Sequence, residues 1–342
     1  MRDGTAEYVH APVMLDQIVH ALAPLNGGVY VDGTLGGGGY ARAILGAANC
    51  RVIGVDRDPA AIRSARQWAP AYGGRLSIVE AAYSGMEEVC AAAGLGPGEL
   101  DGVALDLGVS SVQLDHSERG FSFSQDGPLD MRMSGEGPSA RDVIAHAAED
   151  LLANILYDYG EEKQSRKIAR AIVRAREEAP IETTGALAAI IERAAGPRGG
   201  SRIHPATRSF QALRIFVNDE LGELARGLAA AERLLRPSGR LVVVSFHSLE
   251  DRIVKTFLNA AAGREGGGSR HLPAPESAPP TFRLLHSKPE TPDADEIASN
   301  PRARSAKLRA AIRTSEPAPA APRASWTSRL PSIEDFAREM RL

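Results

Sequence analysis

Short apolar runs alternate with amphipathic helical patterns along the first third of the chain. Four β-branched runs predict strands at Val29–Asp32, Arg51–Asp56, Leu76–Glu80 and Gly102–Asp106. Helical patterns lie between them at Gly39–Leu45, Pro59–Trp68 and Ser84–Ala93. Strands and helices that alternate at this spacing predict a parallel sheet with right-handed crossovers, because parallel neighbours need a long connection.

The alternation stops between about Asp115 and Ser209, where helical sequence rich in alanine and arginine contains no convincing strand. From Phe210 to Leu235 an apolar stripe at helical spacing then predicts one helix that faces a core. The run RLVVVSF predicts a fifth strand, so the sheet resumes. We therefore predict an α/β fold, a Rossmann-like sheet with an inserted and mainly helical domain.

The last part of the chain mixes strand patterns with low-complexity sequence. A helix is predicted over about Glu250–Ala262, a mobile loop over 263–280, and strands at Thr281–Ser287 and Ser305–Arg313. A Pro/Ala linker and a short helix with Ser332 as N-cap follow. The predicted domains are the sheet domain in two parts (1–115 and 210–314), the insert (116–209), and the linker with the terminal helix (315–342).

Composition narrows the class of protein. The chain has 342 residues, of which 43% are hydrophobic and 24% charged, which is typical of a globular protein. No stretch approaches the ~20 apolar residues of a membrane span, so we expect no membrane partner. Cys50 and Cys90 are too few for a disulfide framework and favour a reducing cytoplasm. The eight histidines lack ligand spacing, and we expect no metal.

Positive charge is local rather than global. The net charge is −3, but Gly160–Ile215 holds eleven Lys/Arg against six Asp/Glu. A second basic stretch, PRARSAKLRAAIR, has five basic residues and no acid. Solvated helix faces with ordinary ion pairs explain such stretches as well as phosphate contacts do on charge alone. Clustered arginines beside a catalytic core favour phosphate contacts.

The sequence DGTLGGGGY places a glycine-rich turn between the first strand and a helix, which is typical of a nucleotide-binding corner. Its glycines also satisfy the dinucleotide fingerprint G-x-G-x-x-A, a weak signal by itself. Asp56, at the end of the second strand, is placed to bind ribose hydroxyls, unless it is an ordinary turn acid. Asp32 and Asp106 end the first and fourth strands, where they would attract a cation and repel a pyrophosphate. This favours S-adenosylmethionine over a dinucleotide.

Longer blocks carry a family resemblance. The blocks are DGTLGGGG, LDLGVSSVQLDHSERGFSFSQDGPLDMRM, HPATRSFQALRIFVNDEL, SGRLVVVSFHSLEDRIVKTF and NPRARSAKLR. Together they resemble the bacterial 16S rRNA (cytosine-N4)-methyltransferase family (RsmH, formerly MraW), from about Tyr8 to Arg313. The resemblance implies a Rossmann-like, S-adenosylmethionine-dependent enzyme of the cytoplasm. It would methylate the exocyclic N4 of a decoding-centre cytidine in 16S rRNA within the small ribosomal subunit.

The resemblance also implies cofactor contacts. They fall on Gly38, Gly39, Tyr40, Asp56, Tyr83, Asp106 and Gln113. Tyr40 stands where many relatives have His, which argues against an essential proton acceptor there. Tyr83 replaces Phe and keeps an aromatic ring for adenine. Val112 replaces the usual Pro beside Gln113, which would loosen that loop.

Catalysis requires the amine to lie in line with the S–CH₃ bond and its hydrogens to be accepted. The candidates at strand ends are Asp106, Ser245 and His247. His247 serves equally well as the residue that organises the SFHSLED turn. A hydrolase is disfavoured because Ser245 lacks the G-x-S-x-G elbow.

Substrate contacts are expected in the insert. Phe123, Asp130 and Arg132 lie in an aromatic, charged stretch that could stack on or clamp a flipped base. Burial in the core of a small domain explains the phenylalanine as well. Phosphate contacts are expected from Arg202, His204, Arg208 and Arg214, with helix capping and interdomain ion pairs as the competing explanation.

Two other functions are weighed against the methyltransferase. An NAD-dependent oxidoreductase is favoured only by the glycine fingerprint, and the second mononucleotide half is missing. A non-catalytic ribosome-assembly factor would keep the fold without the chemistry, but intact Asp56, Asp106 and Gln113 argue against a dead site. The sequence leaves a homodimer open.

Overall fold

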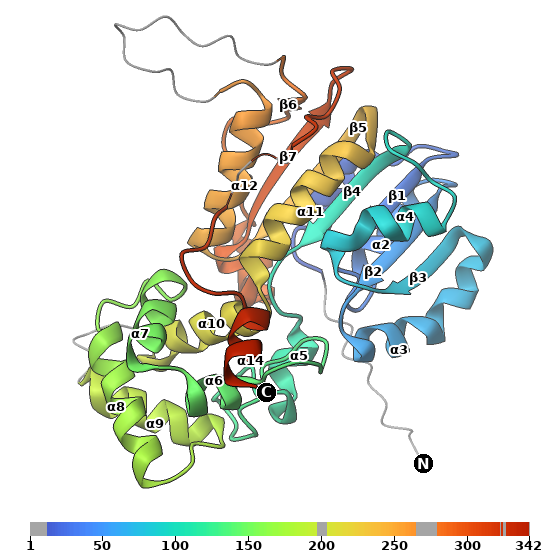
Figure 1. Cartoon of the computed structure of the whole chain (residues 1–342). Helices are drawn as coiled ribbons and strands as arrows, with labels where there is room; N and C mark the ends of the chain where they lie inside the picture. The colour runs from blue at the N-terminus through green and yellow to red at the C-terminus, as the bar shows by residue number, and fades with distance from the viewer. Residues whose placement is uncertain (1–11, 197–203, 265–278, 322, 324–325, 342) are drawn as a thin grey trace, which may run out of the picture. The chain divides into compact units, whose positions relative to one another are not determined.

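A computed structural model describes residues 12–196, 204–264, 279–321, 323 and 326–341. Two compact units divide the chain (Figure 1). The sheet unit comprises Met1–Gly108 and Glu223–Trp326, and the helical unit comprises Val109–Gly222 and Thr327–Leu342. The helical unit is thus mainly an insertion between the fourth and fifth strands. The expected insert, 116–209, lies within its bounds.

The sheet unit is built on seven strands in the order β3-β2-β1-β4-β5-β7-β6. Their bounds are β1 Val29–Asp32, β2 Arg51–Asp56, β3 Leu76–Glu80, β4 Leu100–Asp106, β5 Leu235–Ser245, β6 Phe282–Leu284 and β7 Lys307–Arg313. Neighbours from β3 to β5 are parallel, and β7 runs antiparallel to both β5 and β6. The chain reverses its direction of travel across the sheet between β1 and β4. Ligands bind at such a switch point, beyond the carboxyl ends of the strands.

Helices cover this sheet. They are α1 Leu15–Leu22, α2 Gly39–Ala47, α3 Pro59–Trp68, α4 Met86–Ala92, α11 Glu220–Leu234, α12 Ser248–Ala261 and α13 Ala294–Ser299, with 3₁₀ turns η1 Ala69–Arg75, η2 Tyr83–Gly85 and η4 Pro301–Ser305. One core cluster packs α1 and α2 against β1, β2 and β5. An ion pair between Arg233 and Glu87 joins α11 to α4, and both lie in front of the strands in Figure 1. The α/β fold with an inserted helical domain is confirmed.

Local chemistry explains where several elements begin. Asp58 accepts the amide hydrogen of Ala60, and Pro59 supplies the first turn of α3, which confirms that predicted start. The fifth strand begins earlier than predicted, at Leu235. Leu100 pairs with Leu235 and Gly102 with Arg240, so the residues before RLVVVSF form an irregularity within the strand.

The helical unit contains α5 Ser111–Asp115, η3 Ser117–Arg119, α6 Ala140–His146, α7 Glu149–Asp158, α8 Ser165–Glu178, α9 Thr184–Ala195, α10 Ala206–Val217 and α14 Ile333–Met340. The prediction of one helix over 210–235 is wrong. Asp219 adopts a left-handed φ of 46°, which ends α10 before α11 begins. The apolar stripe continues across the break because both helices face a core.

The C-terminal helix α14 forms as predicted, with the Ser332 hydroxyl accepting the amide hydrogen of Asp335. Ile333 and Phe336 are buried, and the Phe336 ring meets Phe216 of α10 edge to face at 6.1 Å. The terminal helix is therefore part of the core of the helical unit. Most of the loop predicted over 263–280 lies outside the described residues.

Among the residues described, every helix is too short or too polar to span a lipid bilayer.

Candidate active site

Asp32, at the end of β1, holds the glycine-rich turn in place. Its carboxylate accepts the amide hydrogens of Ala41 at 3.0 Å and Thr34 at 3.3 Å. The side chain is fully buried, and burial raises its pKa to about 7 against those two hydrogen bonds. Because both oxygens accept backbone hydrogens and the side chain is fully enclosed, Asp32 shapes the turn.

Asp56, at the end of β2, fastens the same turn from its other side. One carboxylate oxygen accepts the amide hydrogen of Gly36 at 2.7 Å, and the other accepts that of Asp58 at 2.8 Å. Burial raises the pKa of Asp56 against these hydrogen bonds. Each oxygen keeps a second lone pair, so the carboxylate can accept further hydrogens from a diol.

The glycines of the turn differ in what surrounds them. A Cβ on Gly37 would meet nothing within 4 Å, whereas one on Gly38 would lie 2.0 Å from the Trp68 ring. A Cβ on Gly39 would lie 2.0 Å from Pro12. Two of the glycines are thus required by the protein's own packing, and Gly37 leaves bare backbone facing open space.

The two predicted aromatic contacts occupy different environments. Tyr40 is a core residue, only 3% exposed, and its hydroxyl donates to the Val13 carbonyl oxygen at 2.6 Å. Tyr83 is half-buried, and its ring packs against the backbone of Gly227 in α11. A Cβ on Gly227 would lie 2.5 Å from the ring, so that glycine makes room for Tyr83.

Asp106 ends β4 next to the glycine turn. Its amide hydrogen is donated to Thr34 Oγ1 at 2.6 Å, but its carboxylate Oδ1 is buried with no hydrogen-bond partner among the described residues. Burial raises its pKa to about 8; the charges of Asp32 and Glu250 add to the rise, and the nearby Tyr40 hydroxyl, whose hydrogen is donated to Val13, opposes it. An orphaned carboxylate oxygen at the switch point is suited to a cationic ligand or to a donated proton.

Ser245 and His247 lie at the end of β5 in structural roles. The Ser245 hydroxyl is buried and donates to the Lys307 carbonyl oxygen of β7 at 3.4 Å. His247 caps α12, with its Nδ1 accepting the Glu250 amide hydrogen at 3.4 Å and its Nε2 lying 3.1 Å from Glu250 Oε1. These contacts favour the turn-organising interpretation of His247, and the catalytic role of either residue stays a prediction.

Gln113 falls in the helical unit, at the start of α5. Its side-chain oxygen accepts the amide hydrogen of Ser110 at 2.9 Å, and the Ser110 hydroxyl accepts the amide hydrogen of Gln113 at 3.2 Å. This reciprocal capping box orders the chain directly after the fourth strand. Val112 beside it is 56% exposed.

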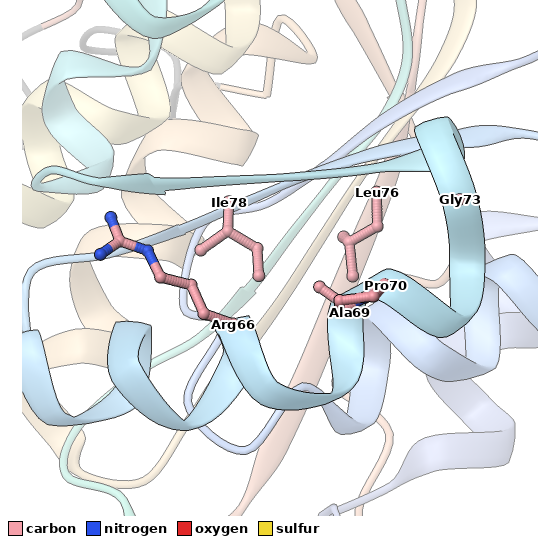
Figure 2. Close-up of a pocket in the computed structure, with 6 residues that line it drawn as sticks. All are labelled: Arg66, Ala69, Pro70, Gly73, Leu76 and Ile78. Carbon is pink, nitrogen blue, oxygen red and sulfur yellow. The ribbon is translucent and has the colours of Figure 1, made fainter.

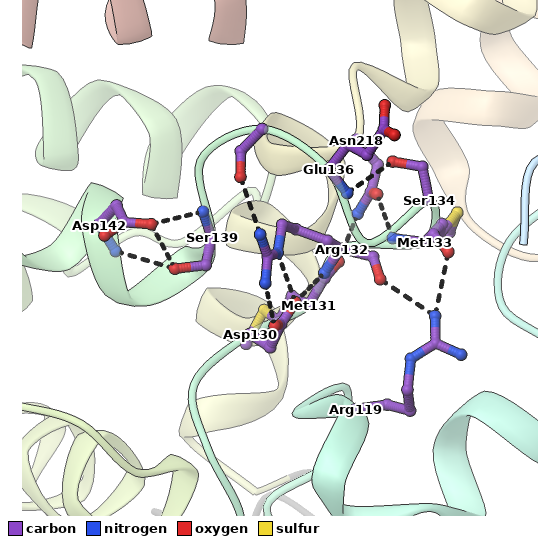
Figure 3. A network of polar contacts seen from close by, with 11 residues as sticks. Arg119, Asp130, Met131, Arg132, Met133, Ser134, Glu136, Ser139, Asp142 and Asn218 are labelled. Carbon is purple, nitrogen blue, oxygen red and sulfur yellow. Dashed lines mark hydrogen bonds and ion pairs between the residues drawn. The ribbon is translucent and has the colours of Figure 1, made fainter. Parts of the chain in front are cut away.

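Three of the predicted substrate residues form local clusters in the helical unit. The Phe123 ring is half-buried, and its centroid lies 4.7 Å from that of the His204 ring, with the two planes tilted by 39°. It also meets Phe210 edge to face at 4.8 Å. The Asp130 and Arg132 side chains are engaged with each other rather than available to clamp a base. Two hydrogen bonds of 2.9 and 2.6 Å join them (Figure 3).

That pair is one part of a wider network that shapes the insert. Burial disfavours the ionised carboxylate of Asp130, but the Arg132 hydrogen bonds outweigh it and the pKa of Asp130 lies below its usual value. The Asn218 amide donates to the Met131 carbonyl at 2.7 Å and accepts the Met133 amide hydrogen at 2.9 Å (Figure 3). These contacts hold buried Met131 in a left-handed conformation, φ 64°.

The arginines predicted to contact phosphates differ in their partners and exposure. Arg214 is bound by Glu220 through two hydrogen bonds of 2.8 and 2.9 Å, with both side chains mostly buried. Arg208 is exposed, and it has no hydrogen bond or ion pair within the part of the chain that the structure describes. Arg202 lies outside the described residues. Of the two arginines that the structure describes, Arg208 is therefore the one whose exposed side chain suits a phosphate.

A pocket of about 250 Å³ lies elsewhere on the sheet unit, between α3, η1 and β3 (Figure 2). Arg66, Pro70 and Ile78 are among its lining residues. It contains neither Asp56 nor Asp106, so it is not the site built at the strand ends.

Sequence reasoning missed three residues of this site. Thr34 receives the Asp106 amide, Trp68 covers Gly38, and Glu250 is a buried acid whose charge acts on Asp106. The spacing of His247 and Glu250 in HSLE resembles a capping box and was a usable signal for the last of these. No sequence pattern indicates that Trp68 covers Gly38, because the two residues belong to different helices that meet only in the folded chain.

The arrangement fits an adenosyl cation such as S-adenosylmethionine. Bare backbone at Gly37 admits close approach, Asp56 can bind vicinal hydroxyls, and the orphaned Asp106 oxygen can face positive charge. Acids at three strand ends, Asp32 included, oppose a pyrophosphate.

Comparison with known proteins agrees with this chemistry. Curated relatives named "Ribosomal RNA small subunit methyltransferase H" include those of Maricaulis maris (56% identical; 90% of this chain and 92% of the relative covered) and Nitrobacter hamburgensis (58%; 91% and 92%). The relative from Parvibaculum lavamentivorans is 56% identical, over 90% of this chain and 91% of its own length. The family model described as "MraW methylase family" matches residues 7–314. The chain belongs to the MraW methylase family.

Proposed function

We propose that this protein transfers a methyl group to the exocyclic N4 of a cytidine in 16S rRNA of the small ribosomal subunit. It is a methyltransferase by family, and its curated relatives are named for small-subunit ribosomal RNA. The choice of N4 is supported by the sequence blocks quoted above and by the acid at the end of β4.

S-adenosylmethionine is the cofactor, and it supplies an electrophilic methyl group on a sulfonium. Asp56 would hold its ribose hydroxyls, and the turn at Gly36 and Gly37 would lie against the nucleoside. Tyr83 is half-buried in the 3₁₀ turn that follows β3, and its ring would lie against the adenine. Gln113, which the resemblance implies as a further contact, belongs to the chain segment that follows β4.

The single observation that carries the proposal is the orphaned Oδ1 of Asp106. The amine of cytosine is a weak nucleophile, because its lone pair is delocalised into the ring. As the nitrogen attacks the methyl group it must lose a proton, and the Asp106 carboxylate, ionised once the cationic cofactor is bound, would accept it. Asp106 would thus first stabilise the positive charge of the cofactor and then accept the proton of the amine.

The helical unit is proposed to bind the RNA. Phe123, packed against His204, would offer an aromatic face to a displaced base, and exposed Arg208 would offer a phosphate contact on α10. Asp130 and Arg132 would act indirectly, by fixing the loop that carries them. An enzyme that acts on ribosomal RNA works in the cytoplasm, where that RNA is found.

An oxidoreductase would use the same glycine turn, so the two functions require a direct test. Calorimetric titration with S-adenosylmethionine and with NAD separates them: we expect micromolar-range binding of the first and none of the second. NAD binding with no S-adenosylmethionine binding would refute the proposal.

A methyl-transfer assay distinguishes the enzyme from a non-catalytic assembly factor. Purified protein, radiolabelled S-adenosylmethionine and small-subunit particles from cells that lack this enzyme should give methylated RNA. Mass mapping should place the added methyl on a cytidine base, and Asp106→Asn should lose transfer while the protein stays folded. Methylation of a ribose or of another base would overturn the N4 assignment.

A further inference from the structure

The helical unit carries a pocket of about 370 Å³ that contains none of the residues discussed so far for the cofactor or the target base. Its walls come from α7, from α8 and from the segment before α14, and they include Asn154, Tyr157, Asp158, Arg166 and Arg329. The volume falls within the range of ~300–1,000 Å³ that is typical of small-molecule sites. The pocket therefore has room for a flat, partly polar group.

Tyr157 gives the pocket an aromatic wall. Its side chain is 61% exposed, which is unusual for a large ring that could have been buried in the adjacent core. A nucleobase stacks on such a ring whatever its identity, because every base has a π-face. Asn154 and Asp158 add hydrogen-bonding groups that suit the polar edge of a base, and the Asp158 carboxylate would repel a phosphate from the interior.

The rim opposite the helices is fixed in place. The Ser328 hydroxyl lies 3.0 Å from the Tyr159 hydroxyl and accepts the Leu330 amide hydrogen at 2.9 Å, which holds Arg329 between them. Helix α14 then anchors this segment through buried Phe336. The segment lies beyond the residues matched by the family model, 7–314, so the pocket is completed by a part of the chain with no family role.

Positive charge surrounds the pocket on α8. The basic stripe consists of the exposed residues Lys163, Arg166, Lys167, Arg170 and Arg174. Arg166 and Arg170 have exposed acidic partners at 3.5 and 3.4 Å, which are weak pairs. Lys163, Lys167 and Arg174 make no hydrogen bond or ion pair within the described residues. Within α8 the charges of Arg166, Lys167, Arg170 and Arg174 share one helix face, and Lys163 lies in the turn just before the helix.

We propose that the pocket and the basic stripe form a second RNA-binding site, which takes an unpaired nucleotide of the substrate remote from the cytosine that is methylated. The base stacks on Tyr157 inside the pocket, and the flanking phosphates lie along the basic stripe and Arg329. This inference rests on the proposed function, because it assumes an RNA substrate. It adds a contact that gives affinity and register without touching the reacting atoms.

The test measures binding of a short fluorescein-labelled single-stranded RNA by anisotropy at several salt concentrations. Tyr157→Ala should weaken binding between about 5-fold and 150-fold with an unchanged salt slope, and Tyr157→Phe should bind like the wild type. The triple variant with Gln at Lys163, Lys167 and Arg174 should flatten the slope of log K against log salt by about 0.7 per lost contact.

A matched triple variant replaces exposed Arg63, Arg264 and Lys288 of the sheet unit by Gln, which removes the same charge. It should keep the wild-type slope. Equal flattening by both triples, or wild-type binding by Tyr157→Ala, would overturn the second site. Arg329→Gln should weaken binding in the same direction as the stripe variant.

Methyl transfer to small-subunit particles separates this inference from the proposed function. If the wild type transfers no methyl group, the proposed function fails, and the anisotropy results still decide the second site. If the wild type is active and the Tyr157 and stripe variants match it in binding and in KM for the particle, only the second site fails. We expect a raised KM with kcat retained.

Discussion

Cofactor affinity should depend on the protonation of Asp106. With a pKa of about 8 raised mainly by burial, this carboxyl is mostly neutral at pH 7 in the free protein. A cationic cofactor requires the ionised form, so binding must expel the proton. The work of ionising it is about 1.4 kcal/mol for each pH unit below 8. The dissociation constant should therefore rise about tenfold at pH 7 and about 100-fold at pH 6, relative to its value well above pH 8.

Isothermal titration calorimetry measures both consequences. Affinity is followed from pH 6 to 9, and titration at pH 7 in two buffers of different ionisation enthalpy should show close to one proton released per cofactor. The matched variant Asp106→Asn has no proton to expel, so it should bind weakly with an affinity independent of pH. A wild-type dissociation constant that stays constant from pH 6 to 8, with no proton released, would refute the assignment of Asp106 as the cation's partner.

Other expectations concern stability and RNA affinity. Because Asp32 and Asp106 have pKa values of about 7 and 8 in the folded state, the folded protein binds more protons than the unfolded chain above about pH 4. The free energy of unfolding from urea titrations should therefore fall as pH rises from 4 to 8, and less steeply in Asp106→Asn. Phe336→Ala removes a fully buried ring and should cost about 3–5 kcal/mol, seen as a lower urea midpoint; an unchanged midpoint would mean that α14 is not part of the core. Arg208→Gln should flatten the salt slope of RNA binding by about 0.7–0.9 at constant Tm, whereas Arg214→Gln should lower Tm by removing the partner of a buried acid. The opposite assignment of the two effects would contradict the roles given to them.

Hydrophobic patterning predicted most of the sheet unit. Runs such as VIGVD and GVALDL are apolar on both faces, a pattern typical of a covered parallel strand, so β2 and β4 could be placed closely. The break between α10 and α11 escaped the same reasoning. A single left-handed residue, Asp219, interrupts the helix while the apolar stripe continues, and periodicity does not detect a change in one φ angle.

The site was predictable where it depends on local sequence and was not where it depends on contacts between distant elements. Strand-end acids follow from chain order, so Asp56 and Asp106 could be placed at the ends of β2 and β4. The engagement of Arg214 by Glu220 spans a helix break and could not be inferred from charge alone. Likewise, the packing of Trp68 on Gly38 joins the end of one helix to the start of another.

The chain passes between the two units three times, at Gly108, at Gly222 and again at Trp326. An inserted domain is ordinarily joined to its host by two adjacent connections and can rotate about them. Here Arg323 is bound to buried Glu232 at 3.1 Å in the sheet unit, and ten residues later Ile333 enters the core of the helical unit. Ten residues extend no further than about 35 Å. The C-terminal segment is therefore a third covalent connection, and its length sets an upper limit on the distance between Arg323 and Ile333.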